Sequence, residues 1–175
     1  QANFRLYQLM TLFRPAMFKD LGAINALYND YILNSAATFD LEPISFSDKT
    51  KWFEQFDESG RSQLWVAFDN TNFVGFATSQ PFRPKAGYRN TVETSIYINP
   101  SAIGKGYGTA LYRHLFLALD ATPVKQAIAI VTRPNPASVK LHQQLGFQTV
   151  GELTDVGEKF GKAQSVYIMQ RTKAE

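Results

Sequence analysis

Residues 91–110, TVETSIYINPSAIGKGYGTA, decide the fold, because a strand, a glycine-rich turn and the start of a helix follow one another directly. Over residues 91–98 the side chains alternate, so that positions 92, 94, 96 and 98 share one face and positions 93, 95 and 97 share the other. One face is apolar and the other is polar. We therefore expect a strand with one face on the core, followed by a turn and a helix.

The turn has the composition of an anion-binding site. Gly104, Gly106 and Gly108 permit positive φ and close approach to the backbone, and Lys105 adds a full charge. The first N–H groups of the following helix lack intrahelical partners and point outward. A tight turn with ordinary capping would use the same residues. The spacing excludes both the P-loop pattern and the dinucleotide-binding G-x-G-x-x-G pattern.

Composition limits the class of protein. The 175 residues correspond to one domain, 1–175, and 45% hydrophobic content is enough to fill a core. The chain has no cysteine and two histidines, so we expect no disulfides, no thiolate chemistry and no metal site. A net charge of +3 without a basic run favours a small anionic ligand, with no nucleic acid and no membrane as partner. We expect a cytoplasmic protein.

Working outward from the central stretch, apolar periodicity predicts the other elements. The uniformly apolar residues 127–131 are typical of a strand covered on both faces. The resulting order, β-α-α-β-β-β-α-β-α-β-β, predicts an α+β fold of three-layer type, with a mixed, mostly antiparallel sheet flanked by helices. The expected elements are a strand at 4–14, a helix over 21–32, a helix capped by Ser47, a hairpin of strands 64–68 and 73–77, the strand 91–98, a helix ending near 120, the strand 127–131, a helix over 135–145, and strands 147–153 and 165–169.

Several longer segments resemble one family. The chain is similar to the GNAT superfamily of acetyl-CoA-dependent N-acetyltransferases, and within it to the branch that acetylates phosphinothricin and methionine sulfone or sulfoximine. The resemblance covers nearly the whole chain and rests on residues 13–40, WF at 52–53, VGFA at 74–77, FRPKAGYRNTVETSIYI at 82–98, GKGYGTALY at 104–112, NPASVKLHQQLGF at 135–147, VGEKFG at 156–161 and MQ at 169–170.

The resemblance implies acetyl-CoA as co-substrate, no metal, and a homodimer. The acetyl and pantetheine portion would contact the backbone of Ile96, Tyr97 and Ile98, and Asn135 would contact the pantetheine arm. The pyrophosphate would lie on the turn formed by Gly104, Lys105, Gly106, Tyr107, Gly108 and Thr109.

Aminolysis of a thioester needs a base for the ammonium proton, donors for the oxyanion and a route for the leaving thiolate. Glu93 is the only acidic residue on its strand and matches the base proposed for the family; the alternative is an exposed residue or one paired with Arg89. A backbone N–H near Ile98, preorganised by a local distortion of the strand, would meet the oxyanion. His142 matches the position that protonates the thiolate in this branch, and the alternative is a solvated helix histidine. We interpret His114 as surface structure.

Recognition of an amino-acid acceptor favours arginine, because guanidinium binds carboxylate in a bidentate manner. Arg83 is the first candidate and Arg89 the second, although the Arg83 segment also fits an exposed basic loop. By resemblance, the acceptor contacts are Arg83, Pro84, Lys85, Glu93, Thr94 and Ser95. The aromatic residues Phe39, Phe82 and Tyr88 are candidates for the pocket wall, with core packing as the alternative.

Two departures from the family pattern leave the substrate open. Ile103 stands where Gln or Arg is usual, which removes one donor near the pyrophosphate, and Ala163 stands where an aromatic residue is common. The first hypothesis is acetylation of the α-amine of a small amino-acid analogue by direct transfer. The alternatives are another amine acceptor (an antibiotic, a polyamine or a protein N-terminus) and a non-catalytic CoA-binding module.

Overall fold

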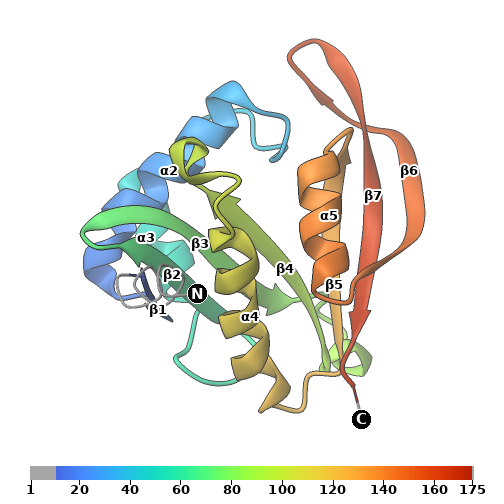
Figure 1. Ribbon diagram of the computed structural model, residues 1–175. Helices are drawn as coiled ribbons and strands as arrows, with labels where there is room; N and C mark the ends of the chain where they lie inside the picture. The colour runs from blue at the N-terminus through green and yellow to red at the C-terminus, as the bar shows by residue number, and fades with distance from the viewer. Residues whose placement is uncertain (1–10, 175) are drawn as a thin grey trace.

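A seven-stranded mixed sheet runs through the computed structural model, which describes residues 11–174 (Figure 1). The strand order is β1-β2-β3-β4-β5-β7-β6, with β4 and β5 parallel and every other neighbouring pair antiparallel. The elements are β1 (Thr11–Pro15), α2 (Leu21–Asn34), α3 (Phe46–Phe53), β2 (Gln63–Asp69), β3 (Asn72–Pro81), β4 (Thr91–Ile98), α4 (Tyr107–Asp120), β5 (Gln126–Arg133), α5 (Pro136–Gln144), β6 (Gln148–Lys159) and β7 (Lys162–Thr172).

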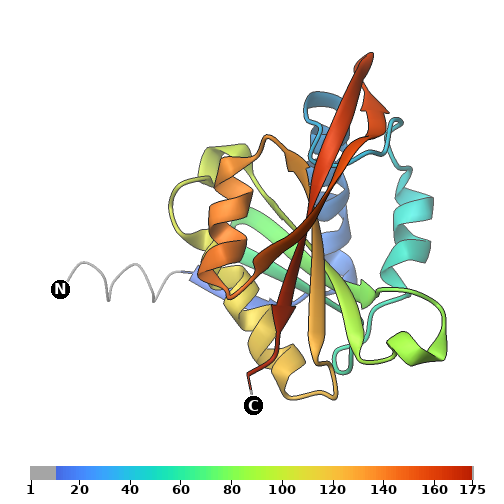
Figure 2. The same ribbon diagram turned by 90° about the vertical axis from the view of Figure 1, so that its right-hand side faces the viewer.

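Helices cover both faces of the sheet. Figure 2 shows α4 and α5 on one side and α2 and α3 on the other. The larger core lies under α4, whose Leu111, Tyr112 and Leu115 are fully buried. The smaller core lies under α2 and α3 and is centred on Phe76 of β3. Strand β4 faces both cores, because Val92 packs into the first and Tyr97 packs against the second.

Strands β4 and β5 part near the middle of the sheet. Their parallel pairing covers only Thr91–Glu93 against Gln126–Ile128, and Figure 1 shows the two strands separating beyond that point. A parting of neighbouring strands leaves backbone N–H and C=O groups without a ladder partner on that side, and such groups need another partner. The opening between β4 and β5 is therefore the part of the fold that positions a site.

The sequence-based order of elements and the mixed sheet are confirmed. The cap of α3 is a correction: Ser45, not Ser47, accepts the hydrogen bond from Asp48 N, at 3.1 Å. The expectation that residues 127–131 are covered on both faces is wrong at Ile130, which is 42% exposed because it borders the opening. Residues 4–10 of the first expected strand lie outside the described residues.

The last hairpin is longer than the pattern predicted. β6 and β7 continue to a turn at residues 160–161, beyond the expected strands 147–153 and 165–169. The pairing shifts in register between Leu153 and Gly157, and Asp155 there adopts φ 53°. Such a bulge breaks the alternation of side chains, so the second half of β6 has no clean period of two. In the described part of the chain, no helix is long and apolar enough to span a membrane.

Candidate active site

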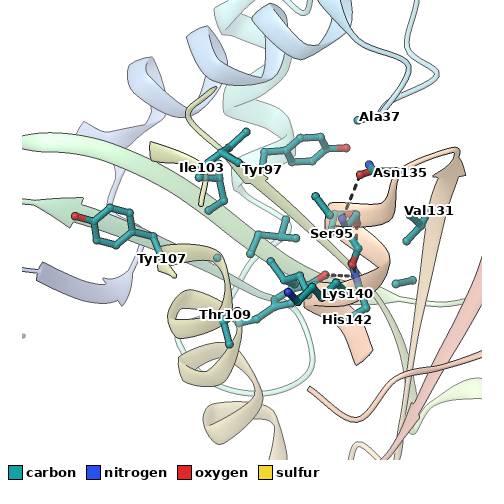
Figure 3. A pocket seen from close by; sticks show the side chains of 18 of the residues that line it. Ala37, Ser95, Tyr97, Ile103, Tyr107, Thr109, Val131, Asn135, Lys140 and His142 are labelled. Carbon is teal, nitrogen blue, oxygen red and sulfur yellow. Dashed lines mark hydrogen bonds between the residues drawn. The ribbon is translucent and has the colours of Figure 1, made fainter. Parts of the chain in front are cut away.

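A cavity of about 440 Å³ occupies the opening between β4 and β5 (Figure 3). β4 and β5 supply two of its sides, and the glycine turn with the first residues of α4 supplies a third. Helix α5 lines most of the remainder along its length, and Tyr31 and Ala37 complete the border. The sequence-predicted residues at its border are Thr94, Ser95, Ile96, Tyr97, Ile98, Gly104, Gly106, Tyr107, Gly108, Thr109, Asn135 and His142.

The alternation of β4 decides which backbone groups face this cavity. Asn99 N donates to Val74 O at 2.7 Å, so the odd-numbered residues of β4 direct their backbone groups toward β3. The backbone groups of Thr94, Ile96 and Ile98 consequently point into the opening. Tyr31 reaches this edge from α2 and donates its hydroxyl to Ile98 O at 2.7 Å. The β3–β4 register is continuous from Gly75↔Ile98 to Pro81↔Val92, so the expected strand distortion is not a register shift.

The glycine turn has the geometry of an anion site. Gly104 and Gly106 both adopt φ +82°, and Gly106 is the N-cap of α4. Ala110 N makes the first intrahelical bond, to Gly106 O at 3.1 Å, which leaves the N–H groups of Gly108 and Thr109 without helical acceptors. The first turn carries no acidic residue. These donors and the positive end of the helix dipole fit a pyrophosphate.

Two further side chains at this cavity have defined roles. Tyr107 points away from the cavity in Figure 3 and donates its hydroxyl to Asp69 at 2.8 Å, so it borders the cavity through its backbone. Asn135 caps α5, because its Oδ1 accepts from Ser138 N at 3.1 Å. Its amide nitrogen has no hydrogen-bond partner within residues 11–174 and is available to a carbonyl of a bound molecule. The cavity thus provides backbone groups for an extended chain and a separate site for its phosphates.

Glu93 lies on β4 with its side chain on the α2–α3 side of the sheet, as the alternation of the strand requires. It is 38% exposed, and the nearest cation is Arg83, with Nη1 at 3.8 Å from Glu93 Oε2. Burial raises the pKa of the Glu93 carboxyl, and the Arg83 charge opposes that rise. Glu93 borders neither cavity and lies two residues from Ser95, which borders both. A carboxylate with a raised pKa is suited to accept a proton. The alternative pairing with Arg89 is not observed among the described ion pairs.

His142 is a buried residue on α5 and not a solvated one. Its Nδ1 lies 2.7 Å from Ser138 O and therefore carries the proton, while Nε2 lies 3.3 Å from the Tyr112 hydroxyl. Burial lowers the pKa of His142, and the hydrogen bond to Ser138 partly opposes this. The Tyr112 hydroxyl also lies 3.3 Å from Thr94 Oγ1 on β4. His142 and Tyr112 thus form a buried polar pair beside the strand opening.

A second cavity, of about 320 Å³, lies on the other face of β4 under α2 and α3. Aromatic rings of Tyr28, Trp52, Phe76 and Tyr97 border it, together with the cation of Lys49. Ser95 and Tyr97 border both cavities. The two spaces therefore meet at the middle of β4, two residues from Glu93. By the roles proposed for them below, we call the first the donor cavity and the second the acceptor cavity.

Comparison with known proteins agrees with this geometry. The model of the acetyltransferase (GNAT) family matches residues 24–147, which is more than half of the chain. The chain belongs to the GNAT acetyltransferase family. It is an N-acetyltransferase that uses acetyl-CoA.

Relatives and solved structures of GNAT enzymes match nearly the whole chain. A phosphinothricin N-acetyltransferase of Streptomyces coelicolor is 39% identical over 90% of this chain and 94% of its own. An L-methionine sulfoximine/L-methionine sulfone acetyltransferase of Pseudomonas aeruginosa is 32% identical over 90% of this chain and 91% of its own. The crystal structure of a phosphinothricin acetyltransferase from Sinorhizobium meliloti in complex with acetyl-CoA has a TM-score of 0.89 and 34% identity, covering 95% of this chain and 90% of that one.

The predicted acceptor loop of this GNAT enzyme does not border either cavity. Arg83 is 56% exposed, stacks over the Phe82 ring at 4.2 Å and donates to Phe82 O at 2.7 Å. Pro84 and Lys85 are also exposed. Arg83 nevertheless lies beside Glu93, so the loop is adjacent to the acceptor side of β4.

The three aromatic wall candidates lie elsewhere. Phe82 and Tyr88 pack edge to face at 5.6 Å within the loop that follows β3. Phe39 packs on Gly157 of β6, where a Cβ would stand 2.5 Å from its ring. The rings that do border the acceptor cavity were not among the candidates, because they come from four separate elements.

The remaining predicted residues have simple placements. Ile103 is 56% exposed and borders the donor cavity. Ala163 pairs with Glu158 near the tip of the β6–β7 hairpin. His114, expected at the surface, stacks on Phe13 at 4.7 Å. Two residues of these cavities were given no role from the sequence. Tyr112 ends the segment GKGYGTALY, and Lys49 belongs to no local motif.

Proposed function

We propose that this GNAT enzyme acetylates the α-amine of a small amino acid of the phosphinothricin, methionine sulfone or methionine sulfoximine type. The observation that carries the proposal is the meeting of two cavities at Ser95 and Tyr97, with Glu93 on the same strand. The named activities of relatives at 39% and 32% identity support the acceptor class.

On the donor side, the main chain does most of the binding. The N–H groups of Gly108 and Thr109 and the charge of Lys105 hold the pyrophosphate, and the backbone groups of Ile96 pair with the pantetheine arm. Asn135 offers its free amide nitrogen to the same arm. Acetyl-CoA supplies an activated acyl group as a thioester. The Ile98 N–H, which points into the opening, is the proposed donor to the oxyanion.

On the acceptor side, Glu93 is the proposed general base. An amino-acid ammonium must lose one proton before its nitrogen can attack the thioester carbonyl, and the Glu93 carboxylate takes that proton directly or through one water. The C–N bond then forms, and the nitrogen gives up its second proton to water as the C–S bond breaks and the thiolate leaves, without a covalent enzyme intermediate. Arg83, 3.8 Å from Glu93, is the proposed partner of the acceptor carboxylate, with Lys85 adding positive charge nearby.

His142 is the proposed source of the proton for the leaving thiolate, and it acts through Tyr112. The donor is the doubly protonated form of His142, in which Nδ1–H stays on Ser138 O and Nε2–H faces the Tyr112 hydroxyl oxygen. Nε2 passes its proton to the Tyr112 oxygen while the Tyr112 hydroxyl proton passes to the thiolate sulfur, so His142 ends neutral and Tyr112 ends protonated. A thiolate with an ordinary pKa near 8.5 also leaves without help. We therefore expect His142→Gln to reduce turnover less than Glu93→Gln.

A thiol-release assay tests the proposed function. Acetyl-CoA is combined with phosphinothricin, methionine sulfone, methionine sulfoximine, ordinary amino acids and polyamines, and free CoA is measured. Turnover is expected with the first three, and Arg83→Ala should lower it for acceptors that carry an α-carboxylate but not for polyamines. Release of CoA only with polyamines would refute the proposed acceptor class. Binding of acetyl-CoA without any release would refute the proposed catalysis.

We also propose a homodimer. The support is the outer strand β6, where Val150, Leu153 and Val156 are 56%, 43% and 54% exposed. Exposed apolar side chains along an edge strand are typical of an association surface. Light scattering coupled to size-exclusion chromatography tests this, and a mass near 19.7 kDa would contradict it. The cytoplasmic location stays a prediction.

A further inference from the structure

Lys49 is the most unusual charged residue outside the proposed catalytic groups. It lies in the middle of α3, yet its side chain is only 3% exposed. Its Nζ lies 4.1 Å from the centre of the Tyr28 ring and 4.3 Å from the centre of the Trp52 ring. All three residues border the acceptor cavity. The two rings therefore hold an ammonium group at the edge of that cavity.

This ammonium group has no hydrogen-bond or ion-pair partner within residues 11–174. The two carboxylates that border the same cavity form their hydrogen bonds with other groups, although the charge of Asp40 favours the charged form of Lys49. Asp40 accepts the Tyr28 hydroxyl at 2.6 Å, and Asp48 accepts from Ser45 at 2.8 Å and from Lys51 at 3.4 Å. A buried cation without hydrogen-bond acceptors is costly to folding, and cation–π contact with two rings offsets only part of that cost. Such a group is expected where a ligand supplies the missing acceptors.

Lys49 and Arg83 lie at opposite ends of the acceptor side of β4. Arg83 contacts Glu93, while the rings around Lys49 pack toward Tyr97, since Tyr28 lies 5.2 Å from the Tyr97 ring. Residues 93 and 97 are four strand positions apart, which is about 13 Å. Two long cationic side chains separated in this way suit an acceptor that carries oxygen at both ends and an amine between them.

We propose that Lys49 binds the oxygen at the far end of the acceptor side chain, an S=O or P–O oxygen, and thereby selects amino acids that carry such a group. This inference rests on the proposed function, because it assigns a selectivity residue to the same acceptor site. Lys49 acts here by binding and not by proton transfer. The Nζ–H groups donate to the sulfone, sulfoximine or phosphinate oxygen, while the α-carboxylate stays with Arg83.

The test compares two acceptors that differ only at that end. Methionine sulfone carries two oxygens on sulfur and methionine carries none, so the ratio of their kcat/KM values isolates the contact with Lys49. Lys49→Met keeps an unbranched side chain and removes the charge. Its expected effect is a fall in this ratio of roughly 10- to 100-fold, from loss of a charge-assisted hydrogen bond. Lys49→Arg is expected to restore much of it, and the KM for acetyl-CoA should not change.

Lys51→Met is the matched control, because Lys51 lies on the same helix but is 74% exposed. It should leave the ratio unchanged. A ratio does not depend on the fraction of folded enzyme, so a poorly folded variant still gives an answer. An unchanged ratio in Lys49→Met, or an equal loss with both acceptors, would overturn the role of Lys49 while the proposed function stands. If the parent enzyme acetylates no amino acid, the proposed function itself fails, and the inference fails with it.

Discussion

Replacing Gly75 by alanine tests how closely β3 and β4 must approach beside the donor cavity. A Cβ at Gly75 would stand 2.4 Å from Tyr97 O and 2.8 Å from Ile98 Cδ1. The first atom belongs to the backbone and cannot rotate away, so the two strands must separate by about 1 Å to reach an ordinary contact. Overpacking of this kind costs about 1–3 kcal/mol. For a chain of this size, a loss of about 2 kcal/mol lowers Tm by roughly 4–8 °C.

The same displacement moves Ile98, whose backbone faces the donor cavity. A misplacement of about 1 Å near reacting groups can reduce turnover by up to about 100-fold. Thermal unfolding followed by circular dichroism measures the first effect, and the thiol-release assay measures the second. Calorimetric titration with CoA measures how well the donor cavity still binds. The control is Gly22→Ala in α2, where a Cβ meets no atom within 4 Å. That change is expected to stabilise the helix by about 0.5–1 kcal/mol. If Gly75→Ala unfolds at the parent temperature and binds CoA equally well, the steric reasoning is wrong.

Three further predictions concern the catalytic strand. A base acts in its deprotonated form, and burial raises the pKa of Glu93, so on lowering the pH kcat/KM should begin to fall at a higher pH than it would with an ordinary glutamate. Glu93→Gln should remove most of the turnover and also this acidic limb of the pH–rate profile. Arg83→Gln removes the positive charge that opposes the rise in the pKa of Glu93, so the acidic limb of the pH–rate profile should move to higher pH. An unmoved limb would exclude electrostatic coupling between Arg83 and Glu93. Tyr31→Phe removes the hydrogen bond to Ile98 O, which is worth about 1 kcal/mol. The KM for acetyl-CoA, measured by steady-state kinetics, should therefore rise several-fold. An unchanged KM would show that other contacts hold Ile98.

The fold was predictable because its signals are local. The alternation over residues 91–98 and the glycines at 104, 106 and 108 each specify a conformation within a few positions. The wrong cap of α3 had a usable signal, since Ser45 stands three residues before Asp48 and Ser47 does not. No signal in the sequence marks the partial exposure of Ile130, because that exposure depends on where β4 separates from β5.

The donor cavity was predictable for the same reason, and the acceptor cavity was not. The donor cavity takes half of its border from one strand, one turn and the helix that follows. The acceptor cavity collects Tyr28 from α2, Lys49 from α3, Phe76 from β3 and Tyr97 from β4. Along α3 the pattern of charges around Lys49 fits a solvated helix face, so nothing in the local sequence marks its burial. The packing of α3 on α2 places Lys49 beside the Tyr28 ring, and Trp52 packs on Phe76 of β3, so tertiary contacts bring this ammonium group inside.

The alternation of β4 explains how one strand serves both substrates in the proposed reaction. Its even-numbered residues direct backbone groups into the donor cavity, and its odd-numbered residues Glu93, Ser95 and Tyr97 direct side chains toward the acceptor side. Because the period is two, a substitution at an odd position changes acceptor chemistry while the donor contacts, which come from the main chain, are retained. Insertion of one residue into β4 would turn the side chains and backbone groups of all following positions to the opposite side. Acceptor selectivity can therefore vary by side-chain replacement within a fixed donor site, whereas the length of β4 cannot change without loss of both.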